Sequence, residues 1–419
     1  MTAPPEITRL PIDVIHLILD KLNTEDQINF GQVHVNFSKA LCYYNKKVYE
    51  KIHPYKLPIQ FWPTILPICG SEIVQIHELF SKHSEVPIVL IEKYCQNIES
   101  IQLKVHSRNV NKITSLLSKR KSLKSVHLYV LDKFELPIEV MDAIRELPQL
   151  NELLLYGVNG EQIDLVQHLN HLEVLSITLK LDSMPVNIFK ICSHIKNLRS
   201  LHISNFDLSF TNKSVLELTN LESLAICNSQ ISTEIPYFPK LKRLKFWGNK
   251  YLVLKLNLYD WIATHAGTLR SLELSFENPQ TFKEIDFLEA LKVCSSIADF
   301  RLHSSISNLF LPSFVKILIK NSFSVGNPFI LSCPNSLKII KELERIPNSG
   351  IIQVRNINGL PAEVVNMARH DPLIPGNIAG QWVKGFSLYV LAQFFEIACE
   401  DKMTSPCSWH YPSYLFYVF

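Results

Sequence analysis

The stretch Leu198-Arg199-Ser200-Leu201-His202-Ile203 shows the pattern that dominates this chain of 419 residues. An apolar residue is followed by two residues of any type, a second apolar residue, one further residue and a third apolar residue. The pattern occurs nine times, and successive starting residues are 20 to 28 positions apart. The nine triplets are Ile98/Ile101/Leu103, Leu123/Val126/Leu128, Leu150/Leu153/Leu155, Leu172/Leu175/Ile177, Leu198/Leu201/Ile203, Leu221/Leu224/Ile226, Leu241/Leu244/Phe246, Leu269/Leu272/Leu274 and Ile297/Phe300/Leu302.

The spacing within each triplet predicts a strand, because residues two positions apart in an extended chain point to the same face. Between the triplets, segments such as Val140, Ile144 and Leu147 have the spacing of three or four residues that is typical of helices. Repeats of 20 to 29 residues with this pattern are typical of leucine-rich repeats. We therefore predict an α/β leucine-rich-repeat solenoid over residues 98–349, with a parallel sheet on its concave face. A set of unrelated α/β units is the alternative.

Composition narrows the classes of function. Lys and Arg number 42 and Asp and Glu 39, so no excess of positive charge favours nucleic-acid binding. Glycine is scarce, with 12 residues, and neither GxxxxGK[ST] nor GxGxxG occurs. The catalytic patterns GxSxG and HExxH are also absent. His127 and His202 fall at outward strand positions, and neither has a recognisable catalytic partner. We expect no enzymatic activity, cofactor or metal.

The cysteines and apolar stretches indicate a compartment. Nine cysteines occur without a CxxC pair, which favours unpaired thiols that serve as small buried hydrophobes under reducing conditions. The first residues lack the layout of a signal peptide. The apolar stretch Phe386–Cys399 is shorter than the roughly 20 residues of a membrane-spanning helix. We expect a protein without a membrane anchor, located in the cytoplasm, the nucleus or both. Lys119-Arg120-Lys121 fits a solvated turn better than a nuclear signal.

Residues 10–44 differ from the repeats. After Leu10-Pro11, apolar residues at 14, 15, 18, 19 and 22 recur with helical spacing. Thr24 and Gln27 match the S/T-x-x-E/Q start signal of a second helix, and a third short helix is expected around Phe37. Gly31 lies inside the second helix, where glycine costs about 1 kcal/mol relative to alanine. A unit of this size rarely folds alone. We therefore expect it to pack on the helices that follow it or on another protein.

This segment resembles an F-box, with Leu10-Pro11, two apolar helices and an ending at Val33 and Phe37. The repeats behind it resemble those of F-box/LRR proteins. The resemblance implies that the F-box binds a Skp-type adaptor and, through it, cullin and RING subunits, so that the chain is the non-catalytic substrate receptor of an SCF ubiquitin ligase in ubiquitin-dependent degradation. The residues expected to bind the adaptor are Leu10, Pro11, Ile15, Ile18, Leu19, Leu22, Phe30, Val33 and Phe37.

The protein substrate is expected on outward positions of the strands, since aromatic residues and Arg anchor interfaces. The predicted residues are Tyr129, Tyr156, Arg243, Lys245, Trp247, Glu273, Arg301 and His303. The predicted organisation is an F-box at 1–50, a helical linker at 51–97, the solenoid at 98–349 and a C-terminal cap or tail at 350–419. Two alternatives to the ligase remain: a scaffold in which the F-box only docks the adaptor, and a plain repeat module for protein binding.

Overall fold

The structure is a computed structural model that describes residues 6–356, except for 47–49, 53–56, 78–86, 132–134, 181–185, 209–217, 232–235, 249–257, 277–281, 304–306, 308 and 334–335. Its first part is helical. A short 3₁₀ helix, η1 (Glu6–Arg9), precedes α1 (Ile12–Leu19), α2 (Thr24–Val33) and α3 (Val35–Tyr44). The three predicted helices are therefore present, and α1 and α2 both pack against α3.

The start of α2 differs from the prediction. Asn23, one residue before Thr24, caps the helix, because its side-chain oxygen accepts a hydrogen bond of 2.9 Å from the backbone N–H of Asp26. The Gln27 side chain does not reach back to the cap; it donates to the carbonyls of Leu19 and Leu22 at 2.9 and 3.1 Å. Gln27 therefore closes the turn between α1 and α2.

Gly31 lies at a close contact between α2 and α3. A Cβ atom at this position would lie 2.5 Å from Cδ2 of Leu41, which is fully buried. The Ser38 hydroxyl donates to the Gly31 carbonyl at 2.6 Å and holds the two helices at this distance. The glycine that disfavours an isolated helix is therefore required by the packing of α2 on α3.

We expect Gly31→Ala to lower the free energy of unfolding by about 1 kcal/mol. The gain of about 1 kcal/mol in helix propensity is outweighed by overpacking, which costs about 1–3 kcal/mol. Chemical denaturation of the full chain measures the change. Gly267→Ala is the matched control, because its Cβ would meet no atom within 4 Å. A Gly31→Ala variant more stable than the parent would contradict the packing argument.

The rest of the described chain is a parallel sheet of 13 strands in the order β1-β2-β3-β4-β5-β6-β7-β9-β11-β12-β13-β14-β15. The strands are β1 (Lys51–Ile52), β2 (Gln75–His77), β3 (Ser100–Val105), β4 (Ser125–Val130), β5 (Glu152–Val158), β6 (Val174–Leu179), β7 (Ser200–Ser204), β9 (Ser223–Cys227), β11 (Arg243–Trp247), β12 (Ser271–Ser275), β13 (Asp299–Leu302), β14 (Phe329–Cys333) and β15 (Ile352–Asn356). β8 (Asp207–Leu208) and β10 (Gln230–Ile231) pair separately. The predicted leucine-rich-repeat solenoid is confirmed.

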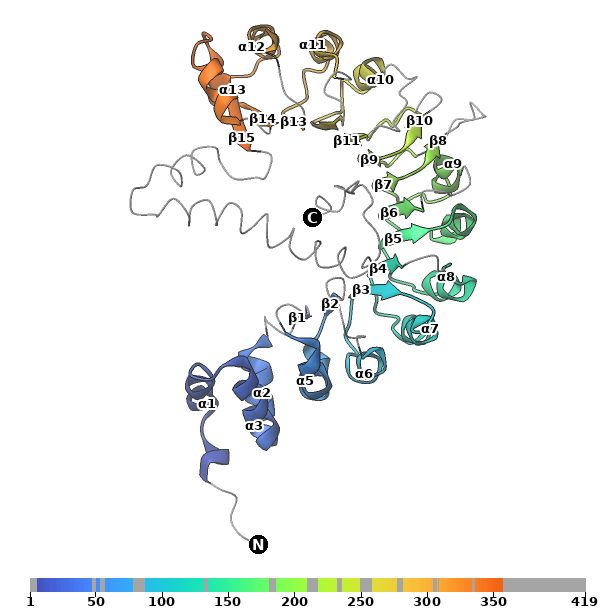
Figure 1. The fold of residues 1–419 in the computed structure, drawn as a ribbon, viewed down its shortest axis with the longest axis vertical. Coiled ribbons are helices and arrows are strands. Elements are labelled where there is room, and N and C mark those ends of the chain that lie inside the picture. Colours follow the sequence, from blue (N-terminus) through green and yellow to red (C-terminus); the bar gives the residue numbers. More distant parts are fainter. Residues whose placement is uncertain are drawn as a thin grey trace, which may run out of the picture. The chain divides into compact units, whose positions relative to one another are not determined.

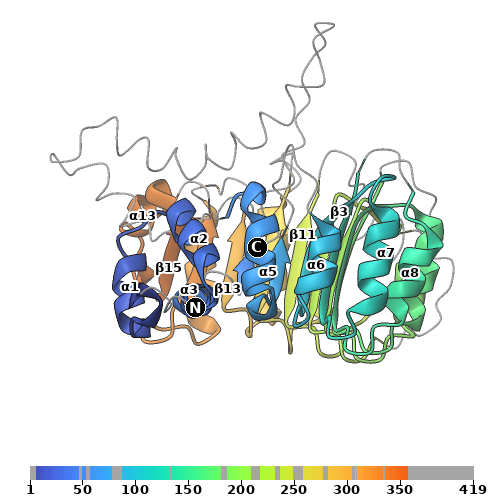
Figure 2. The same cartoon turned by 90° about the horizontal axis from the view of Figure 1, so that it is seen from below.

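Helices return the chain between most strands, on the outer side of the sheet (Figure 1). They are α5 (Trp62–Cys69), α6 (Ile88–Tyr94), α7 (Val110–Lys119), α8 (Ile138–Arg145), α9 (Ile188–Cys192), α10 (Leu258–Thr264), α11 (Glu284–Val293), α12 (Phe310–Lys320) and α13 (Ser336–Leu343). Within the described ranges, the connections also contain the 3₁₀ helices η2 (Ile59–Phe61), η3 (Gly70–Glu72), η4 (Gly160–His168) and η6 (Ser349–Ile351). Figure 2 shows the neighbouring helices α5 to α8 standing side by side. No helix in the described ranges is long and apolar enough to cross a membrane.

All nine triplets form strands in register, and their side chains lie in the core. Leu201 of β7 pairs with Leu175 of β6 and Leu224 of β9, and these three side chains are at most 1% exposed. Because every repeat places its apolar face against the next, the core continues from the α1–α3 helices to β15.

Two boundaries differ from the prediction. The segment 51–97, expected to be a helical linker, contributes β1 and β2 to the same sheet as the repeats. Helices α12 and α13 and strand β14 lie within the predicted solenoid, but β15 at Ile352–Asn356 extends the sheet past its predicted end at residue 349. The predicted cap or tail lies, from residue 357 onward, outside the described residues.

The prediction of unpaired cysteines is wrong for one pair. Cys42 of α3 and Cys69 of α5 form a disulfide with their Cα atoms 5.4 Å apart, which joins the front helices to the first helix of the solenoid. Five described cysteines are free: Cys95, Cys192, Cys227, Cys294 and Cys333. Burial raises the pKa of the Cys95 thiol to about 12, so that thiol stays protonated and behaves as a small apolar side chain.

Gly157 interrupts β5 at a second close approach. Its φ is +73°, and a Cβ atom there would lie 2.6 Å from the Val130 carbonyl oxygen of the neighbouring strand. The pairing register with β6 shifts between Tyr156 and Val158. Only glycine fits a bulge of this kind, which re-aims the end of the strand without breaking the sheet.

Candidate functional site

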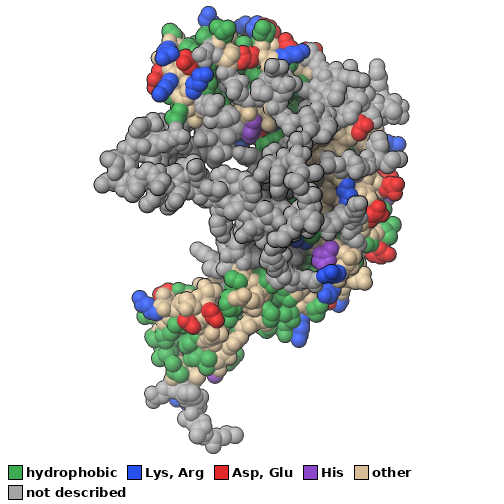
Figure 3. Space-filling model, viewed as in Figure 1, with side chains coloured by type: hydrophobic (Ala, Val, Ile, Leu, Met, Phe, Trp, Pro, Cys, Tyr) green, Lys and Arg blue, Asp and Glu red, His purple; other side chains and the backbone are tan. Residues whose placement is uncertain are grey.

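The first candidate surface lies on the front helices. Helix α1 buries Ile15 and Leu19, which are 2% and 0% exposed, against the other helices. Its opposite side is also apolar, because Val14 and Leu17 are 38% and 64% exposed. Figure 3 shows apolar side chains gathered over this end of the molecule. We call the exposed apolar residues of this region the front surface: Ile12, Val14, Leu17, Val33, Val35 and Tyr43.

The nine residues predicted to bind an adaptor divide into three groups. Pro11 and Val33 are exposed. Leu10, Ile18, Leu22 and Phe30 are half-buried. Ile15, Leu19 and Phe37 are at most 2% exposed and pack inside the molecule, so the prediction is corrected for these three: they support the surface and cannot contact a partner in this arrangement.

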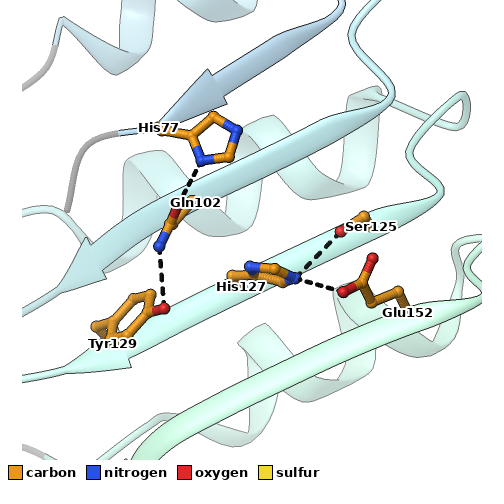
Figure 4. A network of polar contacts seen from close by, with 6 residues as sticks. All are labelled: His77, Gln102, Ser125, His127, Tyr129 and Glu152. Carbon is orange, nitrogen blue, oxygen red and sulfur yellow. Dashed lines mark hydrogen bonds and ion pairs between the residues drawn. The ribbon is translucent and has the colours of Figure 1, made fainter. Parts of the chain in front are cut away.

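Six of the eight predicted substrate residues form two clusters on the inner side of the sheet. In the first, Tyr129 and Tyr156 occupy the same register position on β4 and β5, and their rings are 5.8 Å apart. Gln102 of β3 donates a hydrogen bond of 2.9 Å to the Tyr129 hydroxyl and also contacts the His77 ring (Figure 4). Burial raises the pKa of Tyr129 and lowers that of His77, so both groups stay uncharged near neutral pH.

Beside this cluster, Ser125, His127 and Glu152 form a group that resembles the side chains of a hydrolase triad. Both the Ser125 hydroxyl and the Glu152 carboxylate contact the same nitrogen, Nε2 of His127, at 3.2 and 3.1 Å (Figure 4). In a triad the acid and the nucleophile bind opposite nitrogens. Here Nδ1 of His127 is buried without a partner among the described residues. The geometry therefore does not make His127 a general base for Ser125.

The second cluster joins four of the predicted residues on β11 to β13 and the loop that follows. Glu273 accepts from Lys245 at 3.0 Å and contacts Nε2 of His303 at 3.2 Å. The Lys245 ammonium lies 4.7 Å from the Trp247 ring centroid, and the Trp247 and His303 rings are 4.6 Å apart. Burial acts to raise the pKa of Glu273, but His303 and Lys245 outweigh it and hold that pKa below its usual value.

The other two predicted residues stay outside this cluster. Arg243 at the start of β11 is exposed, and its backbone N–H donates to the Glu222 carbonyl at 2.9 Å. Arg301 of β13 has its Nε atom 3.6 Å from Asp299, and its side chain is 50% exposed. The described residues contain no group of three or more His, Cys, Asp or Glu side chains that could hold a metal ion.

A row of ion pairs at the beginnings of the strands was not predicted from the sequence. Neighbouring repeats pair Glu99 with Lys124 at 2.8 Å, Glu173 with Arg199 at 3.8 Å, and Glu222 with Lys242 at 2.9 Å. These residues all follow the first apolar residue of a triplet, and the alternation of sign at that position was the signal. Because these pairs are exposed to solvent, each contributes little to the stability of the fold.

A comparison with known protein families assigns the segment that contains α1 to α3. The F-box domain family matches residues 7–49. A curated relative, the volume-regulated anion channel subunit LRRC8D of Rattus norvegicus, is 27% identical over 188 residues, which cover 37% of this chain and 21% of the relative. The match therefore spans about a fifth of that relative's length.

Solved structures with similarity include an internalin (inlF) from Listeria monocytogenes, with 16% identity, a TM-score of 0.35 and coverage of 60% of this chain and 68% of that one. A TLR13–ssRNA13 complex has 14% identity, a TM-score of 0.41 and coverage of 70% and 44%. Together with the helices and the 13-stranded sheet described above, the family match leads to one conclusion: the chain carries an F-box domain at residues 7–49, joined to a leucine-rich-repeat solenoid.

Proposed function

We propose that this chain is the substrate-recognition subunit of an SCF-type ubiquitin ligase. Its F-box would bind a Skp-type adaptor, and its repeats would hold a target protein for ubiquitination and degradation. The supporting observation is helix α1, whose exposed side carries Val14 and Leu17 although its other side already fills the core. Apolar side chains gathered on one exposed surface mark a protein interface.

In this role the chain supplies no catalytic group. The adaptor, cullin and RING subunits would bring a ubiquitin-charged enzyme close to a lysine of the bound target, and proximity would raise the effective concentration of the reacting groups. The Ser125–His127–Glu152 group, whose geometry does not fit general-base catalysis, is consistent with a binding role.

We expect Val14→Asp/Leu17→Asp to weaken capture of a purified Skp-type adaptor at least about tenfold. Burying one large apolar side chain contributes about 1.5–3 kcal/mol, and the variant replaces two of them with charges. Titration of the full chain with the adaptor, read by calorimetry, measures the affinity. Ile285→Asp on α11 is the matched control, since Ile285 is 75% exposed far along the solenoid. Equal affinity in the double variant and the parent would refute adaptor docking through the front surface.

Affinity purification from cells separates the ligase from its alternatives. Adaptor together with cullin supports the ligase. Adaptor without cullin indicates a scaffold that uses the F-box only for docking, and neither partner indicates a plain repeat module for protein binding.

A further inference from the structure

Positive charge gathers on the last strands of the sheet. On β3 to β9, the charged residues at outward positions are one cation and one anion, Lys104 and Glu152. On β11 to β15 there are four cations and two anions: Arg243, Lys245, Arg301, Arg355, Glu273 and Asp299. The late end of the inner face is therefore net positive, while the middle strands offer mostly small uncharged side chains.

Both carboxylates of this region have partners within the molecule, although Oδ1 of Asp299 is buried without one among the described residues. Glu273 is held by Lys245 and His303, and Asp299 accepts from the Ser271 hydroxyl at 3.3 Å and lies 3.6 Å from Arg301. The guanidiniums remain accessible. Arg301 is half exposed, and Arg355 is exposed and donates only to the neutral Gln353, at 3.1 Å, among its described contacts.

Arg301 and Arg355 share one row of the sheet. The strand pairing aligns Arg301 with Ser332 of β14, and Ser332 with Arg355 of β15. Two steps between neighbouring strands span about 9.6 Å. A peptide in the polyproline II conformation repeats every three residues, which is about 9.3 Å. Acidic side chains three residues apart on such a peptide, crossing the strands, would therefore reach Arg301 and Arg355 together.

We propose that this row is a docking site for an acidic peptide of the target protein, with Asp or Glu at every third position. The proposal rests on the proposed function, since it names the class of substrate that the repeats hold. Each carboxylate can accept two parallel hydrogen bonds from one guanidinium, which favours Arg over Lys at these positions. Ser332 between them leaves room for the peptide backbone.

The experiment uses the full chain and a labelled 12-residue peptide with Glu at every third position and Ser and Pro between. Fluorescence anisotropy compares it with a peptide of the same composition whose Glu residues are clustered, and with a peptide in which Gln replaces Glu. We expect the periodic peptide to bind best, the clustered peptide several-fold more weakly and the Gln peptide not detectably.

Arg301→Glu/Arg355→Glu should weaken binding of the periodic peptide about tenfold or more, since two attractions become repulsions. The same variant should gain affinity for a peptide with Lys at every third position. Arg108→Glu/Lys112→Glu is the control. Arg108 precedes α7 and Lys112 lies in it, so this variant makes the same change in net charge away from the row and should leave the affinity unchanged. No binding of the periodic peptide, equal binding of the clustered peptide, or equal loss in both variants would overturn the proposal. Adaptor titration of the same preparations tests the F-box separately.

Discussion

Replacing Trp62 with alanine is expected to lower the free energy of unfolding by about 3–5 kcal/mol, the usual cost of removing a fully buried large aromatic side chain. Trp62 begins α5 and is 0% exposed. Its indole N–H donates to the buried Leu57 carbonyl at 2.8 Å. Because α5 packs against both α3 and α6, this side chain lies where the F-box helices meet the solenoid. The cavity left by removing the indole would therefore weaken the packing of both the F-box helices and the solenoid at their junction.

Trp62→Phe is the matched comparison. It retains most of the apolar volume but leaves the Leu57 carbonyl without its donor, so a smaller loss of about 1–3 kcal/mol is expected. Denaturant unfolding, followed by tryptophan fluorescence and by circular dichroism, measures both variants. A Trp62→Ala protein within about 1 kcal/mol of the parent would show that the junction does not depend on this residue.

As the pH falls, the drive to protonate His202 is expected to destabilise the folded protein at a higher pH than protonation of its Asp and Glu side chains does. His202 lies on the inner face of β7 between Ser176 and Ala225 of the neighbouring strands. Burial, and to a smaller extent the charge of Lys245, lowers its pKa to about 4. Because the pKa in the folded chain is below the unfolded value of about 6.5, the stability from neutral His202 is complete above about pH 6.5 and is lost as the pH falls towards about 4.

Between about pH 7 and pH 5 this one group should reduce the free energy of unfolding by about 2 kcal/mol. His202→Gln should remove that part of the pH dependence, while His168→Gln, at the exposed end of η4, should retain it. Glu152 and Glu273 affect stability over a lower pH range. Because their pKa values are lowered in the folded chain, their contribution to the free energy of unfolding is present above about pH 4.5 and is lost as the pH falls below it. Identical pH profiles for His202→Gln and the parent would contradict the assignment. Urea unfolding at both pH values gives the measurement.

The solenoid could be predicted because the residues that specify each strand lie close together in the sequence and recur in every repeat. Triplets such as Leu221, Leu224 and Ile226 specify a strand and its buried face within six residues, and nine copies leave little freedom for their pairing. The ends were harder. β1 contributes two residues to the sheet, and β15 follows a segment where the regular spacing of the triplets ends, so their membership depends on the strand beside them.

The binding surfaces were predictable in type more than in detail. Apolar spacing alone cannot tell Leu17 from Ile15, since which side of α1 is buried depends on where α3 packs. Grouping of Lys245, Glu273 and His303 required the register between strands, which the triplets supply. Arg355 was missed because β15 carries no triplet, and the pairing of Cys42 with Cys69 requires the packing of α3 on α5.

The continuous core between the F-box helices and the repeats has a geometric consequence. Described residues of the F-box helices and of the repeats belong to one apolar core, so the number of repeats fixes the distance along the sheet from the F-box to the last strands. Each repeat adds about 4.8 Å along the sheet. If the F-box binds an adaptor and the repeats bind a target, as proposed, one repeat more or fewer would move the target by this distance relative to the adaptor. Under the proposed function, gain or loss of whole repeats would change which lysines of the target can be reached without changing the contacts within each repeat.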